Sequence, residues 1–224
     1  MMNERKLLVQ RLGRVEYASA LNVQKQTEHL VKSGQQPDTL LLLEHPHTLT
    51  IGRRGDSESV LLNESELKAR QVVLYETNRG GKVTYHGIGQ IVGYPIIKLS
   101  PDREDVHRYV RDLEEVLIRT MADFDIDAFR IEGLTGVHTP RGKVAAIGVH
   151  IARCVTTHGF ALNVNTDLSY FDLIIACEGE PVTSMEELLG NVTELSVVED
   201  RLIVNFANVF EMMTSIEEPV SLLA

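Results

Sequence analysis

The 224-residue sequence predicts an α+β fold, in which helices pack against a mostly antiparallel or mixed β-sheet. Short β-type runs follow one another as adjacent hairpins, the clearest being 144–151 with 155–163. Helical periodicity is confined to separate stretches, such as the apolar spacing across 106–121. Since no linker, repeat or low-complexity tract interrupts the chain, we expect one domain spanning residues 1–224.

The individual elements follow from local patterns along the chain. The first half predicts a helix at 15–33, strands at 40–43 and 49–51, a short helix at 64–70, and strands at 72–76, 83–86 and 91–99. A long helix is expected to open at Ser100-Pro101-Asp102, because Pro at the first position and acids in the first turn are typical of helix starts. The second half predicts β-type runs at 128–132, 135–139, 144–151 and 155–163, a helical turn at 168–173 and a closing helix at 197–213.

Composition excludes several classes of protein. A net charge of −10 argues against nucleic-acid binding, which requires clustered cations. No apolar run approaches the roughly 20 residues needed to cross a bilayer, so no membrane association is expected. The N-terminal residues show neither a secretion signal nor a mitochondrial presequence, and two cysteines are too few for a disulfide scaffold. We therefore expect a cytoplasmic protein.

The segment from Arg79 to Gln90 combines four glycines, two cations and a histidine between predicted strands. Glycine inside strand-rich sequence marks places where another group approaches the backbone closely. The segment is therefore a candidate binding wall whose main-chain amides are used. A hairpin with a glycine-rich turn explains the same composition, and composition alone does not separate the two.

Cys177 is a candidate nucleophile, because an apolar run at 173–176 ends there in a loop containing Gly and Pro. A substrate can reach such a thiol while a dry wall lies behind it. The neighbouring carboxylates of Glu178 and Glu180 disfavour the thiolate. Burial as an inert core cysteine is the alternative interpretation. Cys154, at the predicted hairpin turn, is interpreted as structural.

Lys143 is a candidate base, because it enters the apolar run Val-Ala-Ala-Ile and partial desolvation makes a lysine a usable base. The alternative is an exposed edge-strand lysine that opposes sheet aggregation. Among the eight histidines, His86 and His158 each precede a glycine where the chain can line a pocket, or each can be structural. Metal-site, phosphate-loop, serine-elbow and dinucleotide motifs are absent from the sequence, so no metal is expected.

Several blocks, taken together and in order, resemble the lipoyl(octanoyl) transferases, the lipoate-protein ligase B type of enzyme. The blocks cover most of the chain: 41–46 with 52–55, 79–90 with 94–95, 142–149, 158–165, 168–172, Cys177 and 182–184. The resemblance implies the fold shared by lipoate and biotin protein ligases. It also implies an acyltransferase that moves octanoyl from acyl carrier protein to a lysine of lipoyl domains, the first step of endogenous lipoate synthesis.

By this resemblance, the acyl-accepting cysteine is Cys177 and the lysine that activates it is Lys143. The implied acceptors are the lipoyl domains of 2-oxoacid dehydrogenases and the glycine cleavage H protein, and no cofactor is implied. The implied acyl-binding wall comprises Arg79, Gly80, Gly81, Lys82, Val83, Thr84, Tyr85, His86, Ala146, Ile147, Gly148, Gly159, Phe160 and Ala161.

Three positions depart from the family pattern: Ile88 and Ala176 replace prolines, and Glu178 replaces a glycine beside the nucleophile. The last bears on the rate, because a carboxylate there disfavours the thiolate. Since the implied partners are acidic, a local basic rim is also expected, with the candidates Arg53, Arg54, Arg79, Lys82, Arg141 and Arg153.

Three other functions stay open at this stage. An ATP-dependent lipoate ligase on the same fold would need no cysteine. A non-catalytic module would only bind the carrier or lipoyl domains. An amidotransferase would move octanoyl between two lipoyl domains with the same thiol chemistry.

Overall fold

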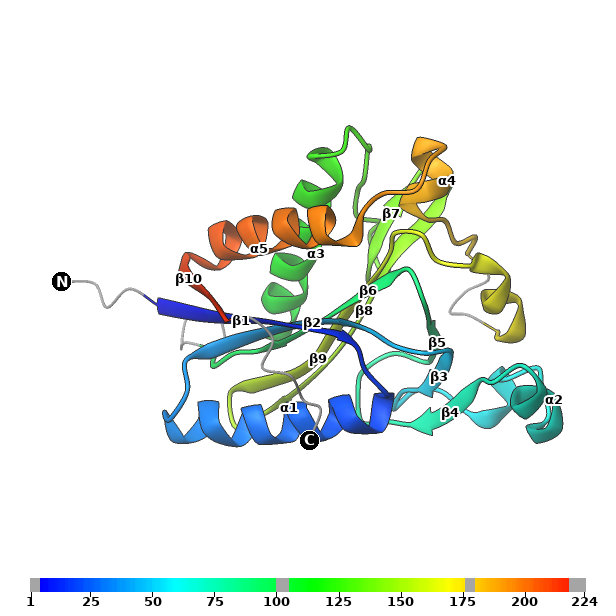
Figure 1. Cartoon of the computed structure of the whole chain (residues 1–224), viewed down its shortest axis with the longest axis horizontal. Coiled ribbons are helices and arrows are strands. Elements are labelled where there is room, and N and C mark those ends of the chain that lie inside the picture. The colour runs from blue at the N-terminus through cyan, green and yellow to red at the C-terminus, as the bar shows by residue number, and fades with distance from the viewer. Residues whose placement is uncertain (1–4, 100–104, 176–179, 218–224) are drawn as a thin grey trace.

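The computed structural model describes residues 5–99, 105–175 and 180–217. Its main element is a seven-stranded mixed sheet with the order β10-β1-β2-β6-β9-β8-β7 (Figure 1). The strands β10, β1 and β2 run parallel to one another, and the remaining neighbours are antiparallel. In sheet order the strands are β10 (Met212–Glu217), β1 (Arg5–Arg14), β2 (Asp38–Glu44), β6 (Gln90–Ile96), β9 (Val155–Asn163), β8 (Gly142–Ala152) and β7 (Val137–Thr139).

A second, three-stranded sheet lies at one end of the main sheet (Figure 1). It consists of β4 (Val73–Glu76), β3 (Thr48–Ile51) and β5 (Val83–His86), with β3 in the middle. The short helices α2 (Glu64–Ala69) and η1 (Ser57–Ser59) belong to this end of the molecule. A small apolar cluster around Leu49 and Tyr85 joins β3 and β5 and includes Ile174, from a segment just before Cys177. This end of the fold therefore carries one flank of the predicted nucleophile.

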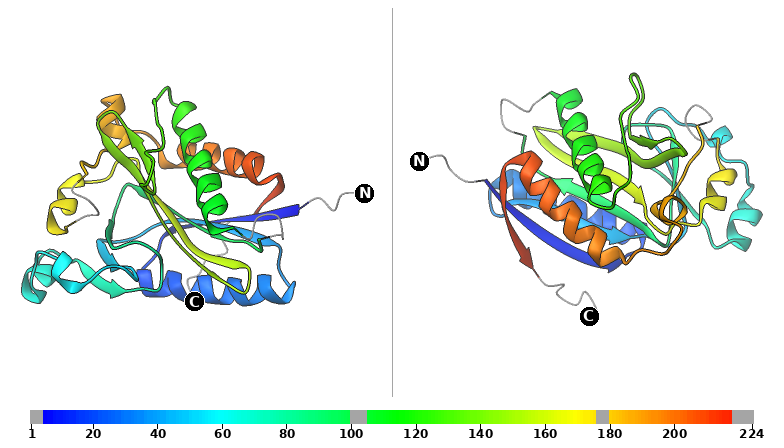
Figure 2. Two further views of the ribbon diagram at one scale, coloured as in Figure 1. Left: turned by 180° about the vertical axis from the view of Figure 1, so that it is seen from behind. Right: turned by 90° about the horizontal axis from the view of Figure 1, so that it is seen from above.

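Helices cover both faces of the main sheet, so the architecture has three layers (Figures 1 and 2). On one face, α1 (Tyr17–Ser33) packs against β6 and β9. On the other, α3 (Val106–Ala122) and α5 (Leu195–Phe210) pack against each other and over the largest apolar cluster. The run at 40–43 in β2 alternates between the two faces and is fully buried on both, as expected of a central strand. The fold class predicted from the sequence is confirmed.

Two short helices complete the chain, the 3-10 helix η3 (Leu168–Leu173) and α4 (Met185–Leu189). The helix α4 begins at Ser184, whose side chain accepts a hydrogen bond from the Glu187 amide, and ends at Gly190 in the left-handed conformation. In the described part of the chain, no helix combines the length and the apolar character that a membrane span requires.

The structure differs from the sequence-based expectations in several elements, and one further expectation falls on residues outside the described part. The strands β1 and β10 were not expected, and the closing helix ends at Phe210 because Glu211 is left-handed, with φ of 55°. The run at 128–132 is no strand, since Phe129 makes only an isolated bridge to His138. The described part of α3 begins at Val106, with Asp105 as its cap, and the start expected at 100–102 lies outside the described residues.

Candidate functional site

A cavity of about 470 Å³ lies where the ends of the two sheets meet. Its floor is built from the hairpin β8–β9, and one wall is the loop at 79–82 that leads into β5. The first turns of α3 and the segment at 133–135 form part of the remaining lining. The volume lies within the range of ordinary small-molecule sites, so the cavity can take an extended acyl chain.

Small residues make the floor of the cavity. In the β8–β9 pairing, Ala146 lies opposite Ala161 and Gly148 lies opposite Gly159. Two methyl groups and two glycines therefore share one face of the sheet. A Cβ atom added at Gly148 would lie 2.9 Å from the Gly80 carbonyl oxygen, so the wall loop approaches the strand as closely as glycine permits. The floor is therefore a backbone surface with almost no side chains standing on it.

A bulge at the start of β8 brings Lys143 to the same face. The pairing with β7 shifts register there: Val137 pairs with Ala145, and His138 pairs with Lys143. As a result Val144 and Ala145 both point into the core, although they are consecutive, and both Lys143 and Ala146 line the cavity. Strict alternation would have put Lys143 on the face of Ala145, away from Ala146.

The backbone of Lys143 is held by the segment that follows Cys177. The Lys143 amide donates to the Pro181 carbonyl oxygen at 2.8 Å, and its carbonyl oxygen accepts from the Thr183 amide at 3.0 Å. The Asn163 side chain in turn donates to the Thr183 carbonyl oxygen at 3.0 Å. Residues 181–183 therefore form a short parallel extension beside β8.

Cys177 itself lies outside the described residues, as do Ala176 and Glu178. The described residues on either side of it are both anchored. On one side, the Ile175 amide donates to the Ser59 carbonyl oxygen at 2.8 Å. On the other, Glu180 lines the cavity, and its Oε2 atom lies 3.4 Å from Nζ of Lys143.

Arg79 supplies a buried positive charge at the wall of the cavity. Its side chain donates to the carbonyl and hydroxyl oxygens of Thr50 and to the Gly80 carbonyl oxygen, at 2.6 to 3.1 Å. The residue is only 7% exposed. The expectation that Arg79 belongs to an exposed basic rim is therefore wrong, because its guanidinium instead ties the wall loop to β3.

Three buried histidines are held in the neutral form, and two of them, His86 and His158, also respond to the Arg79 charge. Burial lowers the pKa of His45 to about 4, and burial together with the Arg79 charge lowers the pKa of His158 to about 4. The pKa of His86 is also lowered, mainly by burial and then by the charges of its neighbours. His45 donates through Nδ1 to the Val15 carbonyl oxygen and accepts at Nε2 from the Tyr94 hydroxyl, each at 2.7 Å. The buried guanidinium thus has neutral imidazoles, those of His86 and His158, within electrostatic reach.

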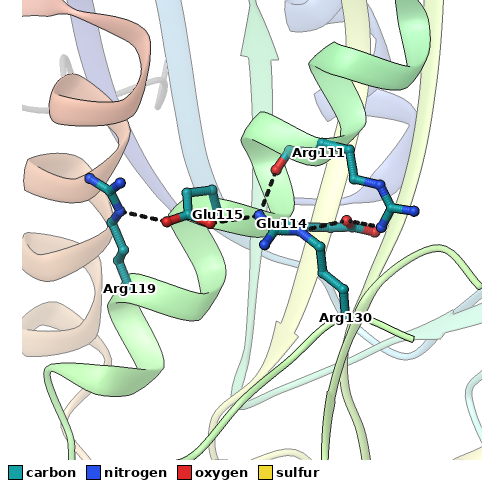
Figure 3. A network of polar contacts seen from close by, with 5 residues as sticks. All are labelled: Arg111, Glu114, Glu115, Arg119 and Arg130. Carbon is teal, nitrogen blue, oxygen red and sulfur yellow. Dashed lines mark hydrogen bonds and ion pairs between the residues drawn. The ribbon is translucent and has the colours of Figure 1, made fainter. Parts of the chain in front are cut away.

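A buried carboxylate, Glu114 of α3, fixes the loop that leads to β7 (Figure 3). It pairs with Arg111 at 2.7 Å and with Arg130 at 3.2 Å, and it accepts a hydrogen bond from the Gly136 amide at 3.0 Å. Gly136 has a φ of 124°, and a Cβ atom there would lie 2.6 Å from Cε of Lys143. The network therefore holds the backbone against which the Lys143 stem lies.

The structure brings almost all of the predicted site residues to this one cavity. The exception among the described ones is Tyr85, which is fully buried beneath it and hydrogen-bonded to His47. The residues that line the cavity are Lys143 and, of the predicted wall, Arg79, Gly80, Gly81, Lys82, Val83, Thr84, His86, Ala146, Ile147, Gly148, Gly159, Phe160 and Ala161.

Other lining residues were missed by the sequence analysis. Tyr17 and Tyr94 had no signal beyond their helical and strand patterns, and Glu114 sits within the apolar stripe of its helix. Tyr17 is buried, and burial raises its pKa to about 12. Among the described residues no cluster of three or more His, Cys, Asp or Glu side chains is arranged to hold a metal ion.

The expected basic rim is present in part. Arg53, Arg54 and Lys82 are exposed, and the latter two line the cavity. Arg141 is exposed and donates to the Glu187 carbonyl oxygen at 2.6 Å. Arg153 lies at the far end of the hairpin, roughly 30 Å along β8 from Lys143 at the usual rise per residue.

Comparison with known proteins places the chain in a family. Residues 16–207 match the lipoyl protein ligase A/B catalytic domain. An octanoyltransferase from Solibacter usitatus (strain Ellin6076) is 50% identical over 208 residues, which cover 92% of this chain and 94% of that protein. The chain therefore belongs to the lipoyl protein ligase A/B catalytic domain family and, within it, to the octanoyltransferases, which are acyltransferases.

Solved structures show the same fold at low sequence identity. A lipoate-protein ligase A bound with ATP superposes with a TM-score of 0.78 at 15% identity, over 97% of this chain and 90% of that one. A bi-partite lipoate protein ligase from Thermoplasma acidophilum, studied with its E2 lipoyl domain, gives 0.75 at 16% identity, over 99% and 89%. These similarities are evidence for the fold alone.

The neutral histidines predict a loss of stability in mild acid. The unfolded chain binds protons at His45 and His158 below about pH 6.5, whereas the folded chain binds them only near pH 4. Their contribution to the free energy of unfolding is therefore complete above pH 6.5 and is lost as the pH falls from 6.5 toward 4. The largest loss is about 3 kcal/mol for each residue. Urea unfolding at several pH values measures it.

His45→Gln should reduce the number of protons taken up on unfolding by up to one, and the unfolding free energy should then vary less with pH. The matched change His29→Gln, at an exposed histidine, should leave that pH dependence unaltered. An unfolding free energy that stays constant between pH 6.5 and pH 5 would contradict the assignment of neutral buried histidines.

The Glu114 network predicts a graded loss of stability. Glu114→Gln keeps an oxygen for the Gly136 amide but loses the charge, at a cost of about 1–2 kcal/mol. Glu114→Leu also leaves that amide buried without a partner and should cost about 3 kcal/mol. Glu115→Gln, at the half-exposed neighbour, should cost less than about 1 kcal/mol. Equal losses for all three variants in denaturant unfolding would show that Glu114 is not the centre of the network.

Proposed function

We propose that this enzyme moves an octanoyl group from octanoyl-acyl carrier protein to a lysine of lipoyl domains, through a thioester on Cys177. One observation carries the proposal: the Lys143 amine lines a cavity with a floor of small residues and lies 3.4 Å from Glu180, which follows Cys177 by three positions in the chain. The cavity suits an unbranched acyl chain, and the amine suits a base for a thiol. We further propose that residues 1–224 act as a single catalytic domain in the cytoplasm.

The first half-reaction transfers the acyl group to the enzyme. Lys143 takes the thiol proton of Cys177, and the resulting ion pair holds the thiolate. The thiolate attacks the thioester carbon of the carrier's pantetheine arm, and main-chain amides of the glycine-rich wall or of the Cys177 loop stabilise the oxyanion. The carbon–sulfur bond to the carrier then breaks, and Lys143 returns its proton to the departing thiolate.

The second half-reaction forms the amide. A lysine amine of the acceptor, having lost its ammonium proton to solvent, attacks the Cys177 thioester. Lys143 takes the remaining surplus proton from the nitrogen as the carbon–sulfur bond breaks, which restores the thiolate and the lysine ammonium. Exchange of a thioester for an amide is downhill, so the reaction as drawn consumes no ATP.

The acceptors that fit this chemistry are the lipoyl domains of 2-oxoacid dehydrogenases and the glycine cleavage H protein. Support for lipoyl domains as partners comes from the archaeal ligase of the same fold, whose structural study includes its E2 lipoyl domain. Acidic donors and acceptors would meet the exposed cations Arg53, Arg54 and Lys82 beside the cavity.

The acyl-enzyme can be tested by intact-protein mass spectrometry after mixing the protein with octanoyl-acyl carrier protein, without ATP or acceptor. We expect one octanoyl group on the wild type and none on Cys177→Ser. Lys143→Met should retain the fold and acylate about 10²–10⁴-fold more slowly, because it lacks the base. Cys154→Ser serves as the matched control and should acylate normally.

An unmodified wild type with intact carrier substrate would exclude the thioester mechanism. Activity that survives Cys177→Ser and requires ATP and free lipoate would instead identify a ligase. Binding of carrier or lipoyl domain without any transfer would identify a non-catalytic module.

The cations beside the cavity predict a salt-dependent rate. Arg53→Glu or Arg54→Glu should lower kcat/KM for the carrier substrate by about tenfold at low ionic strength, and the difference should shrink at high salt because screening removes the attraction. Arg153→Glu, at the distant hairpin end, should change the rate little. Initial rates at two ionic strengths provide the measurement. An equal loss at both would argue against electrostatic docking.

A further inference from the structure

The carboxylate of Glu180 lies between two nitrogen atoms, one from each neighbouring strand. Its Oε2 atom is 3.4 Å from Nζ of Lys143 in β8 and 3.3 Å from Nε2 of His138 in β7. The Lys143 and Glu180 side chains are each 18% exposed, and that of His138 is 3% exposed. The three groups therefore form one largely buried polar cluster at the end of the cavity where Lys143 stands.

His138 meets Glu180 as a donor. An ionised carboxylate only accepts hydrogen bonds, so the hydrogen of that contact belongs to Nε2 of the imidazole. The other ring nitrogen, Nδ1, is buried and has no hydrogen-bond partner among the described residues. Within the part of the chain that the structure describes, Glu180 is thus the one polar partner of the His138 side chain.

We propose that Glu180 is a positioning residue, a counter-ion oriented by His138 that holds the Lys143 amine in place through both halves of the transfer. This inference deepens the proposed function and rests on it for the identity of the reaction. The sequence alone had marked Glu180 only as a carboxylate unfavourable to the nearby thiolate. The structure instead directs its charge at the amine.

The need for a second counter-ion follows from the reaction. When the carrier thiol leaves with the proton, Lys143 is a neutral amine, and the Cys177 thiolate that had held it is consumed in the thioester. Glu180 then accepts a hydrogen bond from Nζ and keeps the amine oriented. In the second half-reaction it stabilises the ammonium that forms again when the amine takes the proton of the attacking lysine, since a largely buried ammonium without a partner is costly.

The His138 hydrogen bond moderates this effect. By donating to Oε2, His138 offsets part of the carboxylate charge, so that Lys143 can still release its proton to the departing thiolate. Among the described residues, the other charged groups that line this cavity near Lys143 are Glu114 and Arg111 of α3, which pair at 2.7 Å, and Glu114 also pairs with Arg130 at 3.2 Å. Of the described side chains, Glu180 is thus the carboxylate in contact with the amine, and His138 acts on that carboxylate.

The proposal predicts opposite effects for its two members on the fraction of Lys143 that is neutral. Competitive acetylation with acetic anhydride at about pH 8, well below the ordinary titration range of lysine, labels only neutral amines. The label on Lys143 is read by peptide mass spectrometry relative to the exposed Lys82. Glu180→Gln should raise the labelling of Lys143 by about 3–10-fold, because it removes the charge and keeps an oxygen.

His138→Leu should lower the labelling by a similar factor, because the carboxylate then acts on Lys143 undiminished. His138→Gln places an amide N–H near the position of Nε2 and should restore the wild-type value. Glu187→Gln is the matched control, since Glu187 belongs to the same stretch of chain but its side chain accepts from Thr183. That control should label like the wild type.

Increases in both Glu180→Gln and His138→Leu would mean that the changes merely loosen the site, and they would overturn the proposal. No change in Glu180→Gln would overturn it as well. The measurement uses the resting protein, so its result is separate from that of the acylation test. If Lys143 labelling rises in Glu180→Gln and falls in His138→Leu but Cys177 is not octanoylated, the role of Glu180 and His138 in setting the state of the amine is supported and the proposed reaction is rejected.

Discussion

The extra residue at the start of β8 is the constraint on which the rest of the site depends. It lets Val144 and Ala145 both stay in the core while Lys143 turns to the cavity side, where Ala146 and the glycine pair continue the floor. Without the shift, either the amine or the small-residue floor would face the wrong side of the sheet. This one bulge thus places the Lys143 amine in the cavity while Val144 and Ala145 both remain in the core.

The two ends of the cavity differ in their electrostatics. At the Lys143 end, a carboxylate and a histidine hold an amine that has to gain and lose protons. Around Arg79, a fixed guanidinium is surrounded by buried imidazoles that stay neutral near pH 7. The first end is therefore suited to proton transfer, and the second to a permanent, structurally held charge.

The fold class and the glycine-rich wall at 79–90 could be predicted from local signals, namely hairpin spacing and a glycine cluster, whereas the wall residues on β8 and β9 were implied by the family resemblance. The strands β1 and β10 could not, since parallel partners far apart in the chain leave no turn between them to recognise. Simple alternation gives no sign of the bulge at Lys143. Glu114 lies in an apolar stripe of α3, and its burial depends on arginines and a backbone amide that only the tertiary structure brings to it.

The parallel pairing of β1 with β10 has a consequence for folding during synthesis of the protein. Arg5 pairs with Met212, so nearly the whole chain must leave the ribosome before this edge of the sheet closes. At 5–20 residues per second that takes about 10–40 s. During this time the open side of β1 is a template for pairing with other chains. The cations Arg5, Lys6, Arg11 and Arg14, placed at its two ends, oppose such pairing while the nascent chain waits for its last strand.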